Sequence, residues 1–223
     1  MLSLLHTIWQ ADGTFPSGGF AFSYGMEGVV ALRSKLDVEE LSELVGTIIR
    51  RRWTTFDRIA LLKSFRAAGD LDEFARIDRD VEASTFGSTM REGSRRNGQS
   101  FLASHARLGD ATALRLREAI GSGACYGHLA VMQGAVWQAM GLDEQMVQLA
   151  SAYGVASGAT AAAVRLGAIG AIGGQKVLRQ SLPLIESSIA APLPADFELS
   201  SFTPFIDIAA ARHARADLRL FAN

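Results

Sequence analysis

The chain has 223 residues, enough to bury one sizeable hydrophobic core, and its length does not demand two domains. Its 22 basic and 23 acidic side chains give a formal net charge of −1, so there is no electrostatic case for binding nucleic acid. The single cysteine, Cys125, excludes an internal disulfide. The N-terminus has no basic region and only a short apolar run, so we expect no signal peptide and a cytoplasmic protein.

The placement of proline predicts an all-α fold. Residues 17 to 182 contain no proline, and no run of residues alternates in the way that marks a β-strand. Apart from Pro16, the prolines all lie late in the chain. We predict one all-helical domain of about ten helices over residues 1–190, followed by a linker and C-terminal tail over residues 191–223.

Hydrophobic spacing and capping residues predict the individual helices. The longest pattern begins after a capping box at Asp37 and Glu40 and predicts one amphipathic helix of six turns or more. The glycines at 170–174 permit an interruption or kink of the chain. In chain order, the predicted helices cover residues 2–10, 20–27 after a Pro-Ser-Gly-Gly turn, 38–60 and beyond, 70–85, 89–107, 110–120, 129–140, 143–166, 177–185 and 205–221.

One stretch near the start, from Gly13 to Glu27, is unusual. Behind its turn, Phe20, Tyr24 and Glu27 recur at positions i, i+4 and i+7, which predicts one stripe of a helix. A carboxylate on an aromatic stripe, in a segment with so little other charge, requires a partner or a function.

Two long intervals carry no Asp, Glu, Lys or Arg. They run from Ala119 to Leu142 and from Gln145 to Val164, and each is long enough to span a bilayer. Both are rich in Gly, Ala and Ser, lack long Leu, Ile or Phe runs, and have no basic flanks. Buried helices that pack closely in a soluble protein are the favoured interpretation, and a membrane-associated protein is the alternative.

Tests for catalytic and metal-binding motifs are negative. The chain has no P-loop, no G-x-S-x-G and no G-x-G-x-x-G motif. Its four histidines are far apart, so we interpret each as a surface or hydrogen-bonded core residue rather than a metal ligand. Cys125 is interpreted as a small core residue.

Two charges remain unexplained by this structural interpretation. Glu27 lies on the aromatic stripe, and Arg165 is the only charge between Gln145 and Gln175. Either charge could belong to a structural ion pair, with the other or with a different partner, or Arg165 could extend its charge to solvent at a helix end. Equally, both could be presented to a binding partner, and the sequence leaves these readings open.

Three sequence blocks together resemble the urease accessory protein UreF family over nearly the whole chain. The first is the Pro-Ser-Gly-Gly-Phe-Ala-Phe-Ser-Tyr-Gly-Met-Glu segment that ends at Glu27. The second runs from Tyr126-Gly-His to Ala-Ala-Ala-Val-Arg-Leu-Gly-Ala-Ile-Gly, which contains Arg165 and ends at Gly170. The third is Pro-Phe-Ile-Asp-Ile around Asp207, followed by His213 and the Arg-Leu-Phe that ends at Phe221.

The resemblance implies a non-enzymatic, all-α chaperone that dimerises. Members of the family bind a second accessory protein, UreD (also called UreH), and recruit the GTPase UreG to deliver nickel to the urease apoprotein. The resemblance therefore implies no cofactor or metal held by this chain itself, but action in a nickel- and GTP-dependent complex. It assigns one group of residues to the GTPase side and another to the UreD side: Glu27, Tyr24 and Arg165 for the first, and Asp207, Arg212, His213, Arg219 and Phe221 in the tail for the second.

An enzyme is the alternative to this accessory role. It would be a helical hydrolase or lyase in which Glu27 acts as general base and Arg165 binds an anionic group. That hypothesis requires both side chains in one pocket, with space for a substrate.

Overall fold

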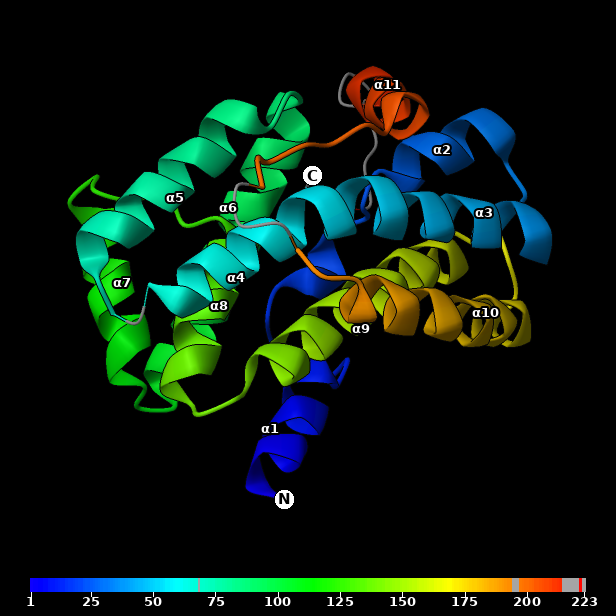
Figure 1. The fold of residues 1–223 in the computed structure, drawn as a ribbon. Helices are drawn as coiled ribbons and strands as arrows, with labels where there is room; N and C mark the ends of the chain where they lie inside the picture. Colours follow the sequence, from blue (N-terminus) through cyan, green and yellow to red (C-terminus); the bar gives the residue numbers. More distant parts are fainter. Residues whose placement is uncertain (68, 194–196, 214–220, 222–223) are drawn as a thin grey trace.

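The computed structural model describes residues 1–67, 69–193, 197–213 and 221 (Figure 1). Over these residues the regular structure is helical and includes no strand, which confirms the predicted all-α fold of about ten helices. The elements in chain order are α1 Leu2–Ala11, the 3₁₀-helix η1 Gly19–Ala21, α2 Met26–Arg33, α3 Val38–Ile48, the π-helix η2 Ile49–Asp57, α4 Arg58–Arg66, α5 Leu71–Ser84, α6 Ser88–Arg107, α7 Ala111–Gly121, α8 Leu129–Ala139, α9 Glu144–Arg165, α10 Ala171–Ala190 and α11 Pro204–His213.

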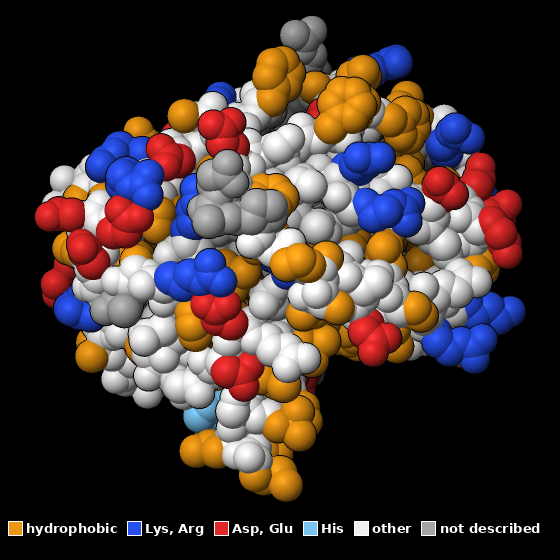
Figure 2. Space-filling model, viewed as in Figure 1, with side chains coloured by type: hydrophobic (Ala, Val, Ile, Leu, Met, Phe, Trp, Pro, Cys, Tyr) orange, Lys and Arg blue, Asp and Glu red, His pale blue; other side chains and the backbone are white. Residues whose placement is uncertain are grey.

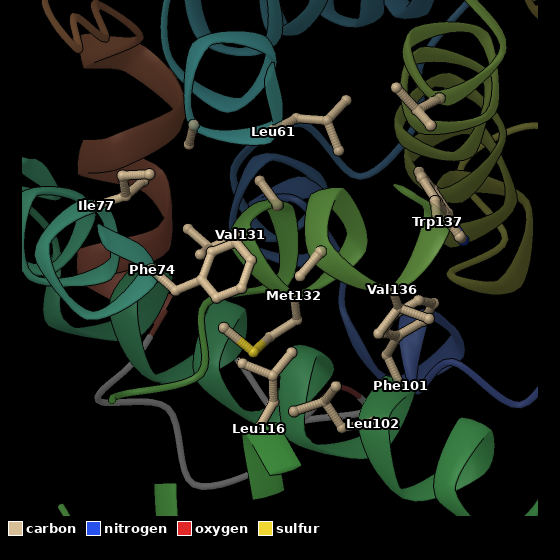
Figure 3. Close-up of a cluster of buried hydrophobic side chains, with 14 of the residues drawn as sticks. Leu61, Phe74, Ile77, Phe101, Leu102, Leu116, Val131, Met132, Val136 and Trp137 are labelled. Carbon is tan, nitrogen blue, oxygen red and sulfur yellow. The ribbon is translucent and has the colours of Figure 1, made fainter. Parts of the chain in front are cut away.

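The hydrophobic core consists of two large clusters that share α9. The first cluster lies among α4, α5, α6, α7 and α8, where Met132 of α8 points toward Leu116 and Leu102 (Figure 3). The second lies among α2, α3, α9, α10 and α11. Because α9 contributes side chains to both clusters, from Val147 to Ala163, the two halves form one domain as predicted.

The two uncharged intervals supply α8 and α9, which are largely buried. Gly134 of α8 lies so close to α4 that a Cβ atom there would overlap the Leu61 carbonyl oxygen and lie 2.9 Å from the Cβ of Ser64. The small residues therefore permit close helix packing, as the sequence predicted. In the part of the chain that the structure describes, no helix is both long and apolar enough to cross a membrane.

The long amphipathic pattern does not form one regular α-helix. A π-helical segment, η2, separates α3 from α4. Ile49 and Trp53 of this segment are buried in the second cluster, whereas Phe56 is buried in the first. The wider π turn therefore lets the helix change the face that it buries as it passes from the second cluster to the first. The hydrophobic spacing in the sequence did not reveal this change.

The predicted helix behind the Pro-Ser-Gly-Gly turn is wrong in its extent. Phe20 lies in η1, while Glu27 lies in α2, and Tyr24 and Gly25 between them have φ angles of 54° and 80°. A left-handed backbone at two successive positions reverses the chain, so the three aromatic and acidic residues do not share one helical stripe.

Four helices begin at an aspartate, as the sequence predicted. Asp37 and Glu40 form the capping box, and the carboxylates of Asp70, Asp110 and Asp143 accept hydrogen bonds from backbone N–H groups of the first helical turns.

Of the glycines at 170–174, Gly170 lies in the break between α9 and α10 as the N-cap of α10, whereas Gly173 and Gly174 lie inside the helix and do not interrupt it. A Cβ atom on Gly174 would lie 2.8 Å from Cγ2 of Val164. This glycine therefore lets α10 approach α9 instead of providing a flexible joint.

The linker from residue 191 is without regular structure where the structure describes it, and it leads to α11. Part of this linker lies along η2, where the carbonyl oxygens of Arg51 and Thr55 accept hydrogen bonds from the N–H groups of Phe202 (3.0 Å) and Ser200 (2.9 Å). The predicted 205–221 helix is confirmed as α11 up to His213, whereas Phe221, the other described residue of this range, is not helical.

Candidate partner-binding site

Helix α2 turns the Glu27 carboxylate inward, toward the end of the chain. The side chain is buried, with 5% of the residue exposed. Its Oε2 atom accepts a hydrogen bond of 3.3 Å from the Phe221 backbone N–H, and its Oε1 atom lies 3.5 Å from Nε2 of His213. Glu27 therefore holds the C-terminal tail at two points, which satisfies the requirement that a buried carboxylate be paired.

Arg165 reaches the same tail residue from the last turn of α9. Its guanidinium lies over the ring of Phe20, 3.4 Å from the ring centroid, and over the ring of Phe221, 4.4 Å from the centroid. It also donates a hydrogen bond to the Phe20 carbonyl oxygen. An arginine suits this position because its planar, weakly hydrated head stacks on aromatic rings.

The structure thus brings together residues that the resemblance had assigned to two different partners. Phe221 is held through its backbone by Glu27 and through its ring by Arg165, and His213 lies beside the same carboxylate. Glu27 is buried and paired within the chain, so in this conformation it has a structural role, and its contact with a GTPase stays a prediction.

Tyr24 is half-buried beside this cluster. Its ring packs edge-on against Phe22, with 4.7 Å between centroids, and a Cβ atom on Gly158 would lie only 2.8 Å from the ring. Burial raises the pKa of the Tyr24 hydroxyl, with the Asp57 charge acting in the same direction, so the hydroxyl is neutral at physiological pH.

The other tail residues have different surroundings. Asp207 accepts a hydrogen bond of 3.1 Å from the Thr203 hydroxyl at the start of α11. Arg212 is exposed, and Arg219 lies outside the described residues.

An apolar surface lies next to this cluster on α11 and the segment before it. Phe202 is 72% exposed and Ile208 60%, and Phe205 and Leu32 of α2 are also exposed. Figure 2 shows hydrophobic side chains gathered over α11 and α2 at the top of the molecule. Exposed apolar patches of this kind are typical of protein–protein contact sites.

The enzyme hypothesis required Glu27 and Arg165 in one pocket, and the cavity beside Arg165 does not place them together among the described residues. Arg165 lines a cavity of about 210 Å³ together with Gln10, Asp12 and Phe20, and Glu27 is not among the described residues of its lining. The space between Glu27 and Arg165 is instead occupied by Phe221.

Two buried charge networks were not predicted from the sequence. Asp78 of α5 is completely buried, and its carboxylate accepts hydrogen bonds from the backbone N–H groups of Tyr126, Gly127 and His128 at 2.5, 2.8 and 2.9 Å. Asp78 sits in a charge-rich part of α5, so its charged neighbours gave no sign that it is buried. The apolar spacing of Phe74, Ile77 and Val81 was the available signal, because position 78 lies on the same helical face.

Arg58 is the second missed residue. It is 3% exposed and its head donates to Oε1 of Gln148 (2.6 Å) and to the carbonyl oxygens of Ile189 (3.0 Å) and Ala191 (2.9 Å). It thereby connects α4 and α9 to the C-terminal end of α10, where the helix dipole favours a cation.

Two histidines and the cysteine are core residues, as predicted. His105 and His128 are buried and each ring contacts a polar partner, Gln10 and Glu82 respectively. Burial raises the pKa of the Cys125 thiol to about 11. Over the described residues, no three His, Cys, Asp or Glu side chains are grouped so that they could hold a metal ion.

The stability of the fold is expected to fall below neutral pH because of these histidines. Burial lowers the pKa of His128, although the nearby carboxylates of Asp78 and Glu82 act in the opposite direction, and burial also lowers the pKa of His105. Both rings are neutral in the folded chain at pH values where the unfolded chain, with pKa values near 6.5, takes up protons. Their contribution to stability is therefore complete above about pH 6.5 and decreases as the pH falls, by up to about 1.4 kcal/mol per pH unit for each histidine.

Urea unfolding between about pH 7.5 and pH 5.5, above the range of ordinary carboxylates, measures this effect. Replacing His105 with asparagine should make the pH dependence shallower. A free energy of unfolding that stays constant over this interval would contradict the prediction.

Comparison with known proteins identifies the family. A model of the UreF family matches residues 36–182, which is more than half of the chain. The chain belongs to the UreF family. This match begins after α2, so Glu27 and the C-terminal tail lie outside it.

Relatives in the UreF family extend over those parts as well. The urease accessory protein UreF of Trichodesmium erythraeum is 32% identical over 217 residues, covering 96% of this chain and 94% of that protein. The urease accessory protein UreF 1 of Brucella melitensis is 31% identical over 224 residues, covering 99% and 92%. The urease accessory protein UreF of Actinobacillus pleuropneumoniae is 29% identical over 225 residues, covering 99% of this chain and 98% of that protein. These names describe accessory proteins rather than enzymes, in agreement with the sequence prediction.

Proposed function

We propose that this UreF-family chain is a cytoplasmic chaperone for nickel insertion into apo-urease. It acts as a homodimer that binds a UreD/UreH-type accessory protein and the GTPase UreG, and it regulates GTP-dependent nickel delivery. In this role nickel is the cargo of the whole assembly, and the chain contributes binding surfaces.

Family membership supports the link to urease, and the tail geometry supports the link to partners. The single observation that carries the proposal is the position of Phe221 between Glu27 and Arg165, because it makes the predicted UreD side and the predicted GTPase side adjacent. A partner that moves the tail also changes the surroundings of both charged residues. The exposed apolar face of α11, with Phe205 and Ile208, supplies the surface for such a partner.

Variants of Glu27 and Arg165 test this proposal in cells that carry a urease operon from which the UreF gene is deleted. The unchanged chain should restore nickel-dependent urease activity, and Glu27→Ala and Arg165→Ala should reduce the restored activity by about tenfold or more, as expected when a charge-assisted contact is lost. Glu27→Gln keeps an acceptor for the Phe221 N–H, and Arg165→Lys keeps the charge but not the flat head that stacks on the rings. Glu27→Gln therefore tests the need for the negative charge, and Arg165→Lys tests the need for the flat guanidinium.

Glu39→Ala and Arg107→Ala are the matched controls, since both side chains are exposed. They should restore activity as well as the unchanged chain. No restoration by the unchanged chain, with compatible partners and a soluble, folded product, would count against the proposal. If Glu27→Ala or Arg165→Ala is unfolded by circular dichroism, that residue is structural and its role in partner contact fails.

A further inference from the structure

Helix α11 lies directly on α2, and the contact depends on two glycines (Figure 1). A Cβ atom on Gly28 would overlap the carbonyl group of Ala209 and lie 2.8 Å from the backbone nitrogen of Ala210. A Cβ atom on Gly25 would overlap Cγ2 of Ile206. Gly28 therefore lets the backbones of α2 and α11 touch, and Gly25, directly before α2, leaves room for the Ile206 side chain. The two residues are here called the glycine seat.

The folding of α11 depends on this contact. The helix has ten residues, and helices of that length are marginal in water without tertiary packing. Its packing partner among the helices is chiefly α2, against which it buries Ile206 and Ala209. An α11 that cannot dock on α2 is therefore expected to lose its helical structure.

The glycine seat also determines the reach of Glu27, which lies between the two glycines in sequence. The Glu27 carboxylate contacts His213 at 3.5 Å and the Phe221 N–H at 3.3 Å, both near the upper limit for a polar contact. A shift of α11 by about 1 Å, which is less than a new Cβ atom on Gly28 needs, would carry His213, the last residue of α11, out of contact with this carboxylate.

We infer that Gly25 and Gly28 are positioning residues for the C-terminal tail. They set the separation of α2 and α11 at which the tail reaches Glu27 and Arg165, and at which α11 presents its apolar face as a folded helix. The inference rests on the proposed function only in its last step, the binding of a partner by the positioned tail.

Hydrogen exchange of the full chain tests the seat directly. In Gly28→Ala, the amides of α11 should exchange at least about tenfold faster than in the unchanged chain, while the amides of α8 and the urea midpoint of the core stay the same. Gly154→Ala is the matched control, because it also adds a methyl group to a helical glycine but meets nothing within 4 Å. Ile206→Ala loosens the same contact without a steric clash and decides the question if Gly28→Ala does not fold.

Binding to a co-expressed UreD-type protein is measured on the same variants. If the α11 amides of Gly28→Ala and Ile206→Ala exchange as slowly as those of the unchanged chain, the inference is overturned. Faster exchange combined with wild-type partner binding would overturn the positioning role. If α11 exchanges faster but the unchanged chain itself binds no such partner, the proposed function fails while the glycine seat stands.

Discussion

Replacing Asp78 with alanine is expected to lower the free energy of unfolding by about 4 kcal/mol. The carboxylate is completely buried, and three consecutive backbone N–H groups, of Tyr126, Gly127 and His128, donate to it. Alanine would leave all three donors without this partner. Those of Gly127 and His128 are buried, and each such buried donor costs about 1–3 kcal/mol. The segment that follows α7 and leads into α8 would lose the anchor that joins it to α5.

Urea unfolding of the Asp78 variants measures this loss. Asp78→Asn keeps one acceptor oxygen and should lose less stability than Asp78→Ala. The matched control is Asp80→Ala on the same helix, because Asp80 forms only an exposed ion pair with Arg76 and should contribute less than about 1 kcal/mol. Equal losses in the free energy of unfolding for Asp78→Ala and Asp80→Ala would show that the buried hydrogen bonds of Asp78 do not stabilise the fold.

Replacing Arg58 with alanine is expected to lower the free energy of unfolding by about 3–4 kcal/mol. Its head donates to the Gln148 side chain and to two carbonyl oxygens at the C-terminal end of α10, on Ile189 and Ala191. Burial lowers the pKa of Arg58, and the Arg66 charge acts in the same direction, but an arginine remains protonated. Alanine would remove three charge-assisted hydrogen bonds and leave a cavity between α4, α9 and α10.

Arg66 on the same helix provides the comparison. It makes two short hydrogen bonds to Glu144, at 2.6 and 2.8 Å, but its side chain is 59% exposed. Arg66→Ala should therefore cost no more than about 1 kcal/mol in spite of its better geometry. Arg58→Lys should fall between wild type and Arg58→Ala, because a single ammonium group cannot reach all three acceptors. If Arg58→Ala and Arg66→Ala lower the free energy of unfolding by similar amounts, burial does not decide how much these arginines stabilise the fold.

The sequence was informative where the cause of a structure is local. The capping aspartates, the helix-forming spacing and the absence of proline over residues 17–182 predicted the helical elements, since each depends on residues a few positions apart. The predicted helix through Phe20, Tyr24 and Glu27 failed for a backbone reason. Spacing alone did not reveal that Tyr24 and Gly25 take left-handed conformations.

Burial of charge could not be predicted in the same way. Sequence reasoning selected Glu27 and Arg165 because they stand in apolar surroundings. Asp78 and Arg58, in charge-rich segments, are buried at least as deeply as Glu27 and more deeply than Arg165, which is only partly buried. A charged side chain is buried when partners from other elements satisfy it. Those partners are 48 to 50 residues away for Asp78 and 90 to 133 residues away for Arg58.

The sequence by itself determined that this chain is an all-α protein and, through three blocks in order, that it resembles the UreF family. The tertiary structure alone decided that Glu27, Arg165, His213 and Phe221 meet at one place, and that α11 rests on a pair of glycines. The physical reason is that helix formation depends on neighbouring residues, whereas the meeting of α2, the end of α9 and the tail depends on packing between segments up to 194 residues apart.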